Sequence, residues 1–159
     1  MQGSIFTIDE HGTIIEMKQE KYENEDLFQS LIEKYPALLA GEQITPDDPR
    51  RWILVSRELG VPDQEGGGDR WYLDHLFIDQ DAIPTLVEVK RSSDTRIRRE
   101  VVAQMLDYAA NAAAYWTADF LRTQYEERVA DKVTQSLADL GINPEDEDSF
   151  WQMCQRTCV

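Results

Sequence analysis

The chain has 159 residues, of which 42% are hydrophobic and 9% aromatic, and 16 Lys and Arg against 31 Asp and Glu give a formal net charge of −15. A chain of this size and apolar content folds as one domain with a buried core, which excludes an intrinsically disordered protein. No run approaches the ~18 consecutive apolar residues of a membrane span, and the N-terminus lacks a signal-peptide pattern, so we expect a soluble, cytoplasmic protein with no membrane partner.

The first half of the chain predicts a hairpin, a helix and a strand. Residues 5–8 and 13–17 are short apolar, β-branched runs on either side of a turn, which is typical of a β-hairpin. Asn24 is placed to cap a helix that ends at Tyr35, because the residue before a proline avoids helical backbone. Residues 52–59 (WILVSREL) predict a strand.

The last third of the chain predicts helices. Asp94 or Thr95 is placed to cap a long helix with apolar positions at the 3.6-residue period. A second helix is expected from about Thr117 to Leu140, with a stop at Gly141, and Asn143-Pro144 begins a short last one. Cys154 and Cys158, four residues apart, are interpreted as small apolar groups of that last helix rather than a disulfide framework.

Charged residues lie within a second predicted hairpin, whose strands 72–78 (YLDHLFI) and 85–90 (TLVEVK) otherwise read as apolar. Glu88 and Lys90 are two residues apart and therefore share one face of their strand. If the hairpin turns midway between the two runs, Asp74 lies opposite Glu88, with side chains about 5 Å apart. Two carboxylates and one ammonium then face the same place.

Two carboxylates this close in an apolar setting need a cation beyond one lysine. Mg²⁺ takes oxygen ligands and is typically held by one or two carboxylates and a substrate phosphate. Lys90 beside such an ion would orient or deprotonate a water molecule and stabilise charge on phosphorus. The pattern therefore predicts phosphodiester hydrolysis with Mg²⁺ or Mn²⁺, and the alternative is a buried Asp74, Glu88 and Lys90 ion cluster without a metal.

A second Glu-x-Lys sequence in the chain serves as a comparison. Glu16-Met17-Lys18 has the same spacing, but no strand-borne Asp precedes it at a suitable distance and a polar run follows it. We interpret it as a solvated strand end, which shows that the tripeptide alone does not define a site.

The motifs together resemble the PD-(D/E)XK nuclease superfamily and, within it, the RecB-like branch. Asp74 and Glu88-Val89-Lys90 resemble the defining motif, and Gln104-x-x-x-Tyr108 resembles the branch's Gln-x-x-x-Tyr helix motif. Glu25 resembles the helix-borne Glu that precedes the core. The similarity spans about residues 24–116 of a single domain, 1–159, with a helical extension over 117–159.

The resemblance implies an α/β fold: a restriction-endonuclease-like core with a central mixed β-sheet flanked by helices, here with an N-terminal β-hairpin and C-terminal helices. It also implies Mg²⁺-dependent cleavage of DNA that leaves a 5′-phosphate. By position, Asp74 and Glu88 would bind the metal together with the Val89 carbonyl. Lys90 would assist the attacking water, and Glu25 would complete or support the metal shell.

Nucleic-acid contacts are expected beside this site. Gln104 and Tyr108 are one helical turn apart and would border one cleft. Four arginines that follow the catalytic strand would contact phosphates: Arg91, Arg96, Arg98 and Arg99. Structural alternatives stay open, namely a first-turn acid for Glu25, an ordinary polar helix position for Gln104, core packing for Tyr108 and a solvated helix start for the arginines.

Other conspicuous side chains are expected in the core. His75 faces away from Asp74 on its strand, and we interpret it as a packed histidine. The tryptophans are expected in the core rather than as base-stacking platforms: Trp52, Trp71, Trp116 and Trp151.

Two rival functions compete with a deoxyribonuclease. One is a catalytically silent nucleic-acid-binding or protein-interaction module of the same fold. The other is an acidic protein-binding domain that mimics nucleic acid or recruits a nuclease partner. The net charge of −15 also favours a homodimer or a basic partner subunit, because an isolated acidic domain approaches DNA slowly.

Overall fold

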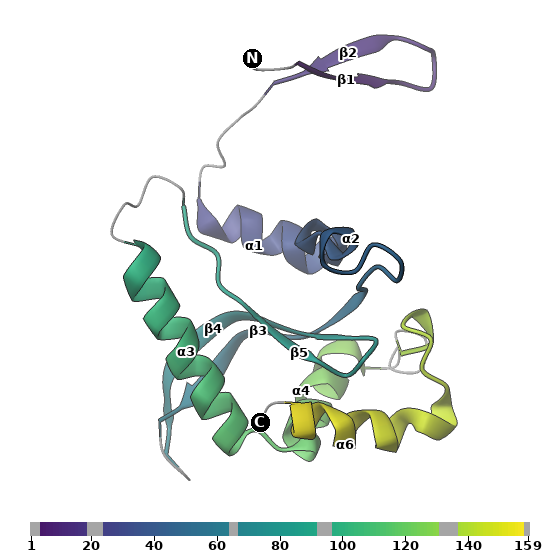
Figure 1. Cartoon of the computed structure of the whole chain (residues 1–159). Coiled ribbons are helices and arrows are strands. Elements are labelled where there is room, and N and C mark those ends of the chain that lie inside the picture. Colours follow the sequence, from purple (N-terminus) through teal and green to yellow (C-terminus); the bar gives the residue numbers. More distant parts are fainter. Residues whose placement is uncertain (1–3, 19–23, 64–66, 92–96, 131–136, 158–159) are drawn as a thin grey trace.

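The protein consists of an α/β body and a separate N-terminal hairpin (Figure 1). The computed structural model describes residues 4–18, 24–63, 67–91, 97–130 and 137–157. The mixture of strands and helices agrees with the α/β class expected from the sequence. None of the helices in the described ranges is long and apolar enough to cross a membrane.

The hairpin has the predicted position. β1 (Ile5–Ile8) pairs antiparallel with β2 (Ile14–Met17). The Asp9 carboxylate accepts hydrogen bonds from the backbone N–H groups of His11 and Thr13 at 2.9 and 2.8 Å, which closes the turn.

The body is built on a three-stranded sheet in the order β3-β4-β5: β3 (Trp52–Pro62), β4 (Asp69–Asp79) and β5 (Pro84–Val87). Every pairing in it is antiparallel, so the mixed sheet implied by the resemblance is not found among the described residues. The physical reason is that the described residues after β5 continue into helices, whereas a parallel strand needs a crossover followed by another strand.

The register between β4 and β5 is the predicted one. His75 pairs with Val87, and Ile78 pairs with Pro84, so a continued ladder would bring Asp74 opposite Glu88. However, β5 ends at Val87, and the predicted strand to Lys90 is three residues too long. The ladder stops because the next available N–H, that of Val89, donates to the Asp74 side chain instead of a backbone carbonyl.

The helix before the sheet begins where expected. In α1 (Glu25–Lys34), the Asn24 side chain accepts a hydrogen bond from the Leu27 N–H at 2.8 Å, which confirms the predicted N-cap. Two short helices follow, η1 (Pro36–Leu39) and α2 (Gly41–Ile44).

The helices after the sheet are α3 (Ile97–Tyr115), α4 (Ala118–Val129), η3 (Pro144–Asp146) and α6 (Glu147–Thr157). The predicted caps of α3, Asp94 and Thr95, lie outside the described residues. The helix predicted over 117–140 is wrong in length, because α4 ends at Val129 and the next residue, Ala130, has φ +48°. A short helical turn at residues 137–139 precedes Gly141, which adopts φ +86°. This left-handed conformation is the one expected of a glycine that ends a helix.

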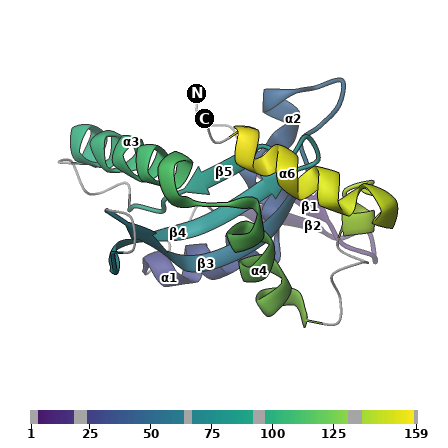
Figure 2. The same cartoon turned by 90° about the horizontal axis from the view of Figure 1, so that it is seen from below.

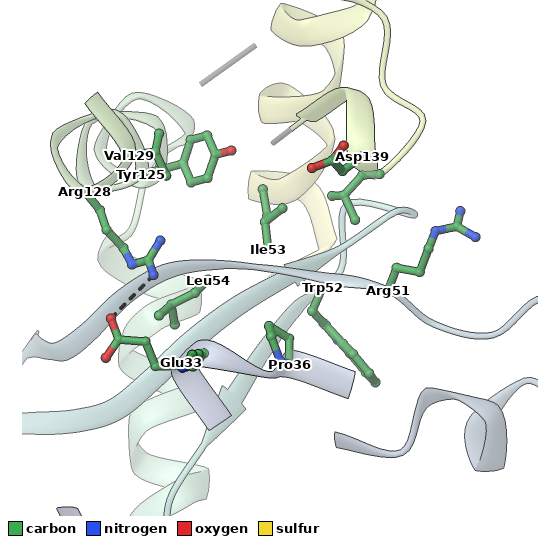
Figure 3. Close-up of a pocket in the computed structure, with 12 residues that line it drawn as sticks. Glu33, Pro36, Arg51, Trp52, Ile53, Leu54, Tyr125, Arg128, Val129 and Asp139 are labelled. Atoms are coloured by element: carbon green, nitrogen blue, oxygen red, sulfur yellow. Dashed lines mark hydrogen bonds and ion pairs between the residues drawn. The ribbon is translucent and has the colours of Figure 1, made fainter. Parts of the chain in front are cut away.

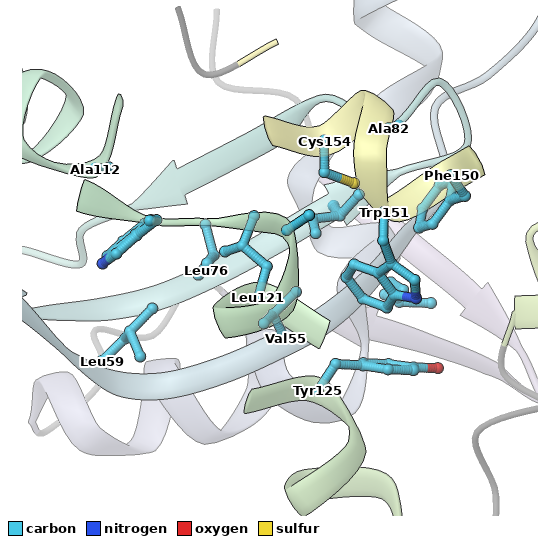
Figure 4. Close-up of a cluster of buried hydrophobic side chains, with 14 of the residues drawn as sticks. Val55, Leu59, Leu76, Ala82, Ala112, Leu121, Tyr125, Phe150, Trp151 and Cys154 are labelled. Atoms are coloured by element: carbon cyan, nitrogen blue, oxygen red, sulfur yellow. The ribbon is translucent and has the colours of Figure 1, made fainter. Parts of the chain in front are cut away.

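Two apolar clusters hold the layers together, one on each face of the sheet. The larger cluster joins β3 and β4 to α3, α4 and α6, and Figure 4 shows Trp151 and Cys154 of α6 within it. The smaller cluster joins α1 to the other face through Ile32, Leu54 and Phe77. Figure 2 shows α1 on the opposite side of the strands from α3.

The side chains predicted for the core are mostly buried. His75 is 0% exposed, and Trp52, Trp116 and Trp151 are buried. Trp71 is half-buried and packs against the edge of the larger cluster. Cys154 is buried, as expected, whereas Cys158 lies outside the described residues.

Candidate active site

The predicted site residues converge where β4 and β5 separate. Three segments meet there: the first turn of α1, the segment from Glu88 to Arg91 after β5, and one face of α3. In Figure 1 one end of α1 and one end of α3 lie on either side of the non-helical segment that leaves β5. The segment from Glu88 to Arg91 is therefore in contact with both helices.

Asp74 fixes the backbone at the base of the site. Its Oδ2 accepts a hydrogen bond from the Val89 N–H at 2.7 Å. On the other side of β4, Glu58 lies between the ladder pairs Arg57–His75 and Leu59–Leu73 and has φ +54°. Such a left-handed conformation costs about 1 kcal/mol or more in a residue with a side chain, so the sheet is locally strained beside Asp74.

The Glu88 side chain is buried more deeply than that of Glu25. It is 4% exposed, and its Oε1 accepts from Lys90 Nζ at 2.7 Å and from Gln104 Nε2 at 3.1 Å. Its second oxygen, Oε2, is buried and has no hydrogen-bond partner among the described atoms. A buried polar atom is usually paired with a protein group, an ion or an ordered water molecule, so Glu88 Oε2 is the oxygen of this carboxylate that is open to a further ligand.

Glu25 joins the site from the first turn of α1. Its Oε2 is 4.0 Å from Lys90 Nζ, and its Oε1 accepts from the Arg91 backbone N–H at 3.1 Å. The Arg91 Nε also lies 3.8 Å from the same carboxylate. Glu25 thus does more than occupy a favourable position in the helix dipole, because it binds the segment that follows β5.

Gln104 and Tyr108 form a second support on α3. Gln104 Nε2 lies 2.6 Å from the Tyr108 hydroxyl, which in turn donates to the Tyr72 carbonyl at 3.4 Å. Tyr108 is only 3% exposed, so its ring has no free face for the nucleic-acid contact expected from the sequence. Its hydroxyl instead orients Gln104, which holds Glu88.

The pKa values of Asp74 and Lys90 are both raised, but for different physical reasons. Burial raises the pKa of Asp74, and the nearby Glu88 charge adds to this effect against the Val89 hydrogen bond. Burial alone would lower the pKa of Lys90, but its hydrogen bond to Glu88 and the charges of Asp74 and Glu25 raise it overall. The raised pKa of Lys90 favours its protonated, ammonium form beside Glu88.

Two carboxylates, those of Asp74 and Glu88, are the candidate donors for a hard divalent cation. Among the described residues, no group of three or more His, Cys, Asp or Glu side chains is arranged to hold a metal without help. Mg²⁺, however, usually takes only one or two protein carboxylates and keeps several waters. Asp74 and Glu88, with the buried Glu88 Oε2 still lacking a partner, match that smaller requirement.

The basic segment is described only in part. Arg91 is more than half exposed, with 57% of its side chain accessible, and Arg99 is exposed near the start of α3. Arg96 and the side chain of Arg98 lie outside the described residues. Both arginines that can be placed are thus open to solvent, and Arg91 contacts the site through Glu25.

Arg57 is a supporting residue that our sequence analysis missed. It lies on β3 and forms ion pairs with Asp26 and with Glu33, the latter at 3.5 Å, and it donates to Gln29 Oε1 at 3.1 Å. These bonds fix α1, and so Glu25, against the sheet. A charged residue inside a strand that otherwise reads as apolar was the available signal, the same one that identified Asp74 and Glu88.

A separate pocket lies away from this cluster. It has a volume of about 430 Å³ and is lined by the end of α1, the start of β3 and α4 (Figure 3). Figure 3 shows the Arg128–Glu33 ion pair across it, at 3.5 Å. None of the predicted site residues lines this pocket.

Comparison of the chain with protein families, curated proteins and solved structures gives no match. The case for a function therefore rests on the geometry of the site.

Proposed function

We propose that this protein is a Mg²⁺-dependent deoxyribonuclease that hydrolyses phosphodiester bonds. The observation that carries the proposal is the buried Glu88 carboxylate, which has one oxygen bonded to Lys90 and Gln104 and the other without a partner. Burying a carboxylate with one unpaired oxygen lowers the stability of the folded protein. Binding of a metal ion to that oxygen would offset this loss. Glu88 and Lys90, two residues apart and close to Asp74, also supply the carboxylate and the amine that phosphodiester hydrolysis would need.

Asp74 and Glu88 would hold Mg²⁺ or Mn²⁺ in this proposal, with the Val89 carbonyl as a third ligand. The ion would supply a polarised phosphate and an activated water molecule. Asp74 has one oxygen bonded to the Val89 N–H, which fixes its carboxylate for this task.

Lys90 acts on water and phosphate through its ammonium group. Its Nζ lies within 2.7 Å of Glu88 and 4.0 Å of Glu25, so two acids hold the amine at the edge of the cluster. From there it donates a hydrogen bond to the attacking water or to a phosphate oxygen, and it stabilises the negative charge that grows on phosphorus. Gln104 keeps Glu88 in the orientation that this arrangement needs.

The restriction-endonuclease-like core is part of the proposal. Its support is the order of elements: a helix that carries Glu25, an antiparallel sheet that carries Asp74 and is followed directly by Glu88, and then a helix that carries Gln104. DNA is the proposed substrate, and Arg91 and Arg99 are the proposed phosphate contacts among the described side chains.

The test is metal binding and cleavage by the full chain. Calorimetric titration with Mn²⁺ and cleavage of fluorescently labelled single- and double-stranded DNA in Mg²⁺ are measured for the wild type, Asp74→Asn, Glu88→Gln and Lys90→Met. We expect the first two variants to lose metal binding and cleavage, and Lys90→Met to bind metal but cleave at least about 100-fold more slowly.

Glu16→Gln and Lys18→Met are the matched controls, because they change the second Glu-x-Lys sequence of the same chain. Both should leave metal binding and cleavage unchanged. Metal binding that does not depend on Asp74 and Glu88 would contradict the site. Metal binding without cleavage of any DNA would favour the silent binding module instead.

A further inference from the structure

The N-terminal hairpin is apolar on both of its faces. In the antiparallel register, Ile5, Ile15 and Met17 share one face with Thr7. The opposite face carries three further apolar side chains and one acid: Phe6, Ile8, Ile14 and Glu16. A hairpin with one solvated face would alternate apolar and polar residues, so this pattern is that of a two-stranded sheet covered on both sides.

Neither face is covered by the residues that the structure describes. The six apolar side chains are between 49% and 71% exposed. The hydrogen bonds and the ion pair described for the hairpin are internal to it. Figure 1 shows it apart from the body, on the side of α1.

A hairpin of this kind does not persist alone. Two strands without a packed face are marginally stable in water, and six exposed apolar side chains on so short a segment form a surface that associates. The hairpin therefore requires a surface that buries it.

A second uncovered apolar surface lies on α1 and η1. Leu27 and Leu31 are one turn apart on α1, Tyr35 follows at its C-cap and Leu38 lies in η1, and they are 45%, 37%, 50% and 53% exposed. The neighbouring stripe of α1 packs on the sheet through Ile32. We call the four exposed residues the α1 stripe.

We propose that the hairpin and the α1 stripe form the interface of a homodimer. In this arrangement the hairpins of two copies stack face to face about a two-fold axis, and the outer face of each hairpin packs on an α1 stripe. The proposal rests on the hairpin and the stripe alone, independently of the proposed nuclease activity.

A second copy is favoured over internal folding because of the number of faces. Each chain has two apolar hairpin faces and one stripe, so folding the hairpin back onto its own stripe leaves one hairpin face in water. Two copies supply four hairpin faces and two stripes. One face of each hairpin packs against the other hairpin, and the remaining face of each hairpin packs on an α1 stripe. A two-fold interface is self-complementary, so no other partner is needed.

The apolar surface is large enough for a stable dimer. Fully burying an aliphatic side chain removes roughly 60–120 Å² from water, at about 25 cal/mol/Å². Ten side chains that are about half exposed thus supply several hundred Å² per copy. With their polar neighbours, this approaches the roughly 800 Å² per partner of a standard interface.

The experiment is sedimentation equilibrium of the full chain in the presence of a chelator, so that metal has no part in it. We expect a dimer in the wild type. Ile14→Glu and Ile15→Glu change neighbouring residues on opposite hairpin faces, and Leu27→Glu changes the stripe. Each should raise the dimer dissociation constant about 30-fold or more, as expected for loss of a buried apolar anchor.

Leu106→Glu is the matched control, because Leu106 is 66% exposed on α3 and outside the proposed interface. It should leave the dimer intact. Thermal melts establish that each variant keeps a folded body, and hydrogen exchange should be faster over residues 25–39 in Ile14→Glu than in the wild type. A monomeric wild type overturns the proposal, as does a dimer that withstands the hairpin variants or that is sensitive on only one hairpin face.

Discussion

The Asp74 carboxylate accepts a hydrogen bond from the Val89 backbone N–H at 2.7 Å, just beyond the last ladder pair of β4 and β5, His75–Val87. The side chain occupies the position that a backbone acceptor would fill in a longer ladder. The two strands separate at this point, and Glu88 is left between Lys90 and the α3 residue Gln104. One carboxylate thus both ends the strand and belongs to the proposed metal site.

Asp74→Asn is expected to stabilise the metal-free protein at neutral pH. The Asn side chain still accepts from Val89 but carries no charge. Because burial raises the folded-state pKa of Asp74, the folded protein holds this proton more tightly than the unfolded chain does, and stability falls as pH rises from about 4 through the raised pKa. The variant avoids that loss, so its Tm in EDTA should rise by a few degrees.

Asp107→Asn, on the exposed side of α3, is the control for Asp74→Asn and should not change the Tm. A Tm below that of the wild type would show that the Asp74 charge stabilises the metal-free fold. If the proposed site is right, Asp74→Asn also loses Mn²⁺ binding. A gain in stability with a loss of binding is expected where a charged residue is kept for function.

Tyr108→Phe tests the support that α3 gives to Glu88. The ring stays packed, but the hydroxyl contacts to Gln104 and the Tyr72 carbonyl are lost. We expect a modest loss of stability, about 0.5–1.5 kcal/mol by urea unfolding. Cleavage or metal affinity should fall by roughly 10- to 100-fold, as for loss of a residue that orients a metal ligand.

Tyr72→Phe is the control for Tyr108→Phe, because Tyr72 contributes its backbone carbonyl and its side chain is 59% exposed. It should keep full activity. Equal effects of the two variants would contradict the orienting role of Tyr108.

Arg99→Gln should change the salt dependence of DNA affinity. A phosphate contact contributes a slope of about −0.9 in log K against log salt on duplex DNA, so loss of one contact should flatten the slope by that amount. Arg156→Gln, at an exposed position on α6, should leave the slope unchanged. An unaltered slope for Arg99→Gln would place the DNA-binding face elsewhere.

Short-range features of the fold could be predicted from the sequence. Asn24 as a cap, Gly141 as a stop and the register that brings Asp74 towards Glu88 all depend on residues close together in the chain. The burial of His75 followed from strand alternation.

Features set by distant parts of the chain were not predictable in the same way. The end of β5 depends on a side chain from β4, and the length of α4 depends on a backbone reversal at Ala130 that no glycine or proline marks. The hydrogen bond between the Glu25 side chain and the Arg91 backbone joins residues 66 positions apart in the sequence. Sequence spacing alone could not decide whether Glu25 only interacts with the helix dipole, whereas this bond links it to the segment that follows Glu88.

Arg57→Ala should loosen α1 and thereby disturb Glu25. It removes the bonds to Asp26, Gln29 and Glu33 and leaves the buried Gln29 amide and the Asp26 carboxylate without this partner, whereas Glu33 keeps its ion pair with Arg128. We expect a loss of about 1–3 kcal/mol in unfolding free energy, and weaker cleavage, because the first turn of α1 is no longer fixed. Arg70→Ala is the contrast: Arg70 is 62% exposed in its pair with Asp63, and its loss should cost at most about 1 kcal/mol.

His75 gives the protein a stability that depends on pH near neutrality. The ring is 0% exposed, and its Nε2 lies 3.0 Å from the Gln29 carbonyl, so that nitrogen carries the proton of the neutral ring. Burial lowers the pKa of His75 below its ordinary value of 6.5. The unfolded chain therefore takes up a proton first as pH falls, and the stabilising contribution, complete above about pH 6.5, is lost below it.

Urea unfolding in EDTA between about pH 7 and pH 5 measures this loss. His75→Gln should flatten the dependence on pH while lowering stability at pH 7, because an amide replaces a ring packed against Phe77. His11→Gln is the control, since the His11 side chain is 81% exposed in the hairpin turn, and it should leave the wild-type dependence in place. If His75→Gln keeps the full dependence on pH, then groups other than the buried ring titrate in this range.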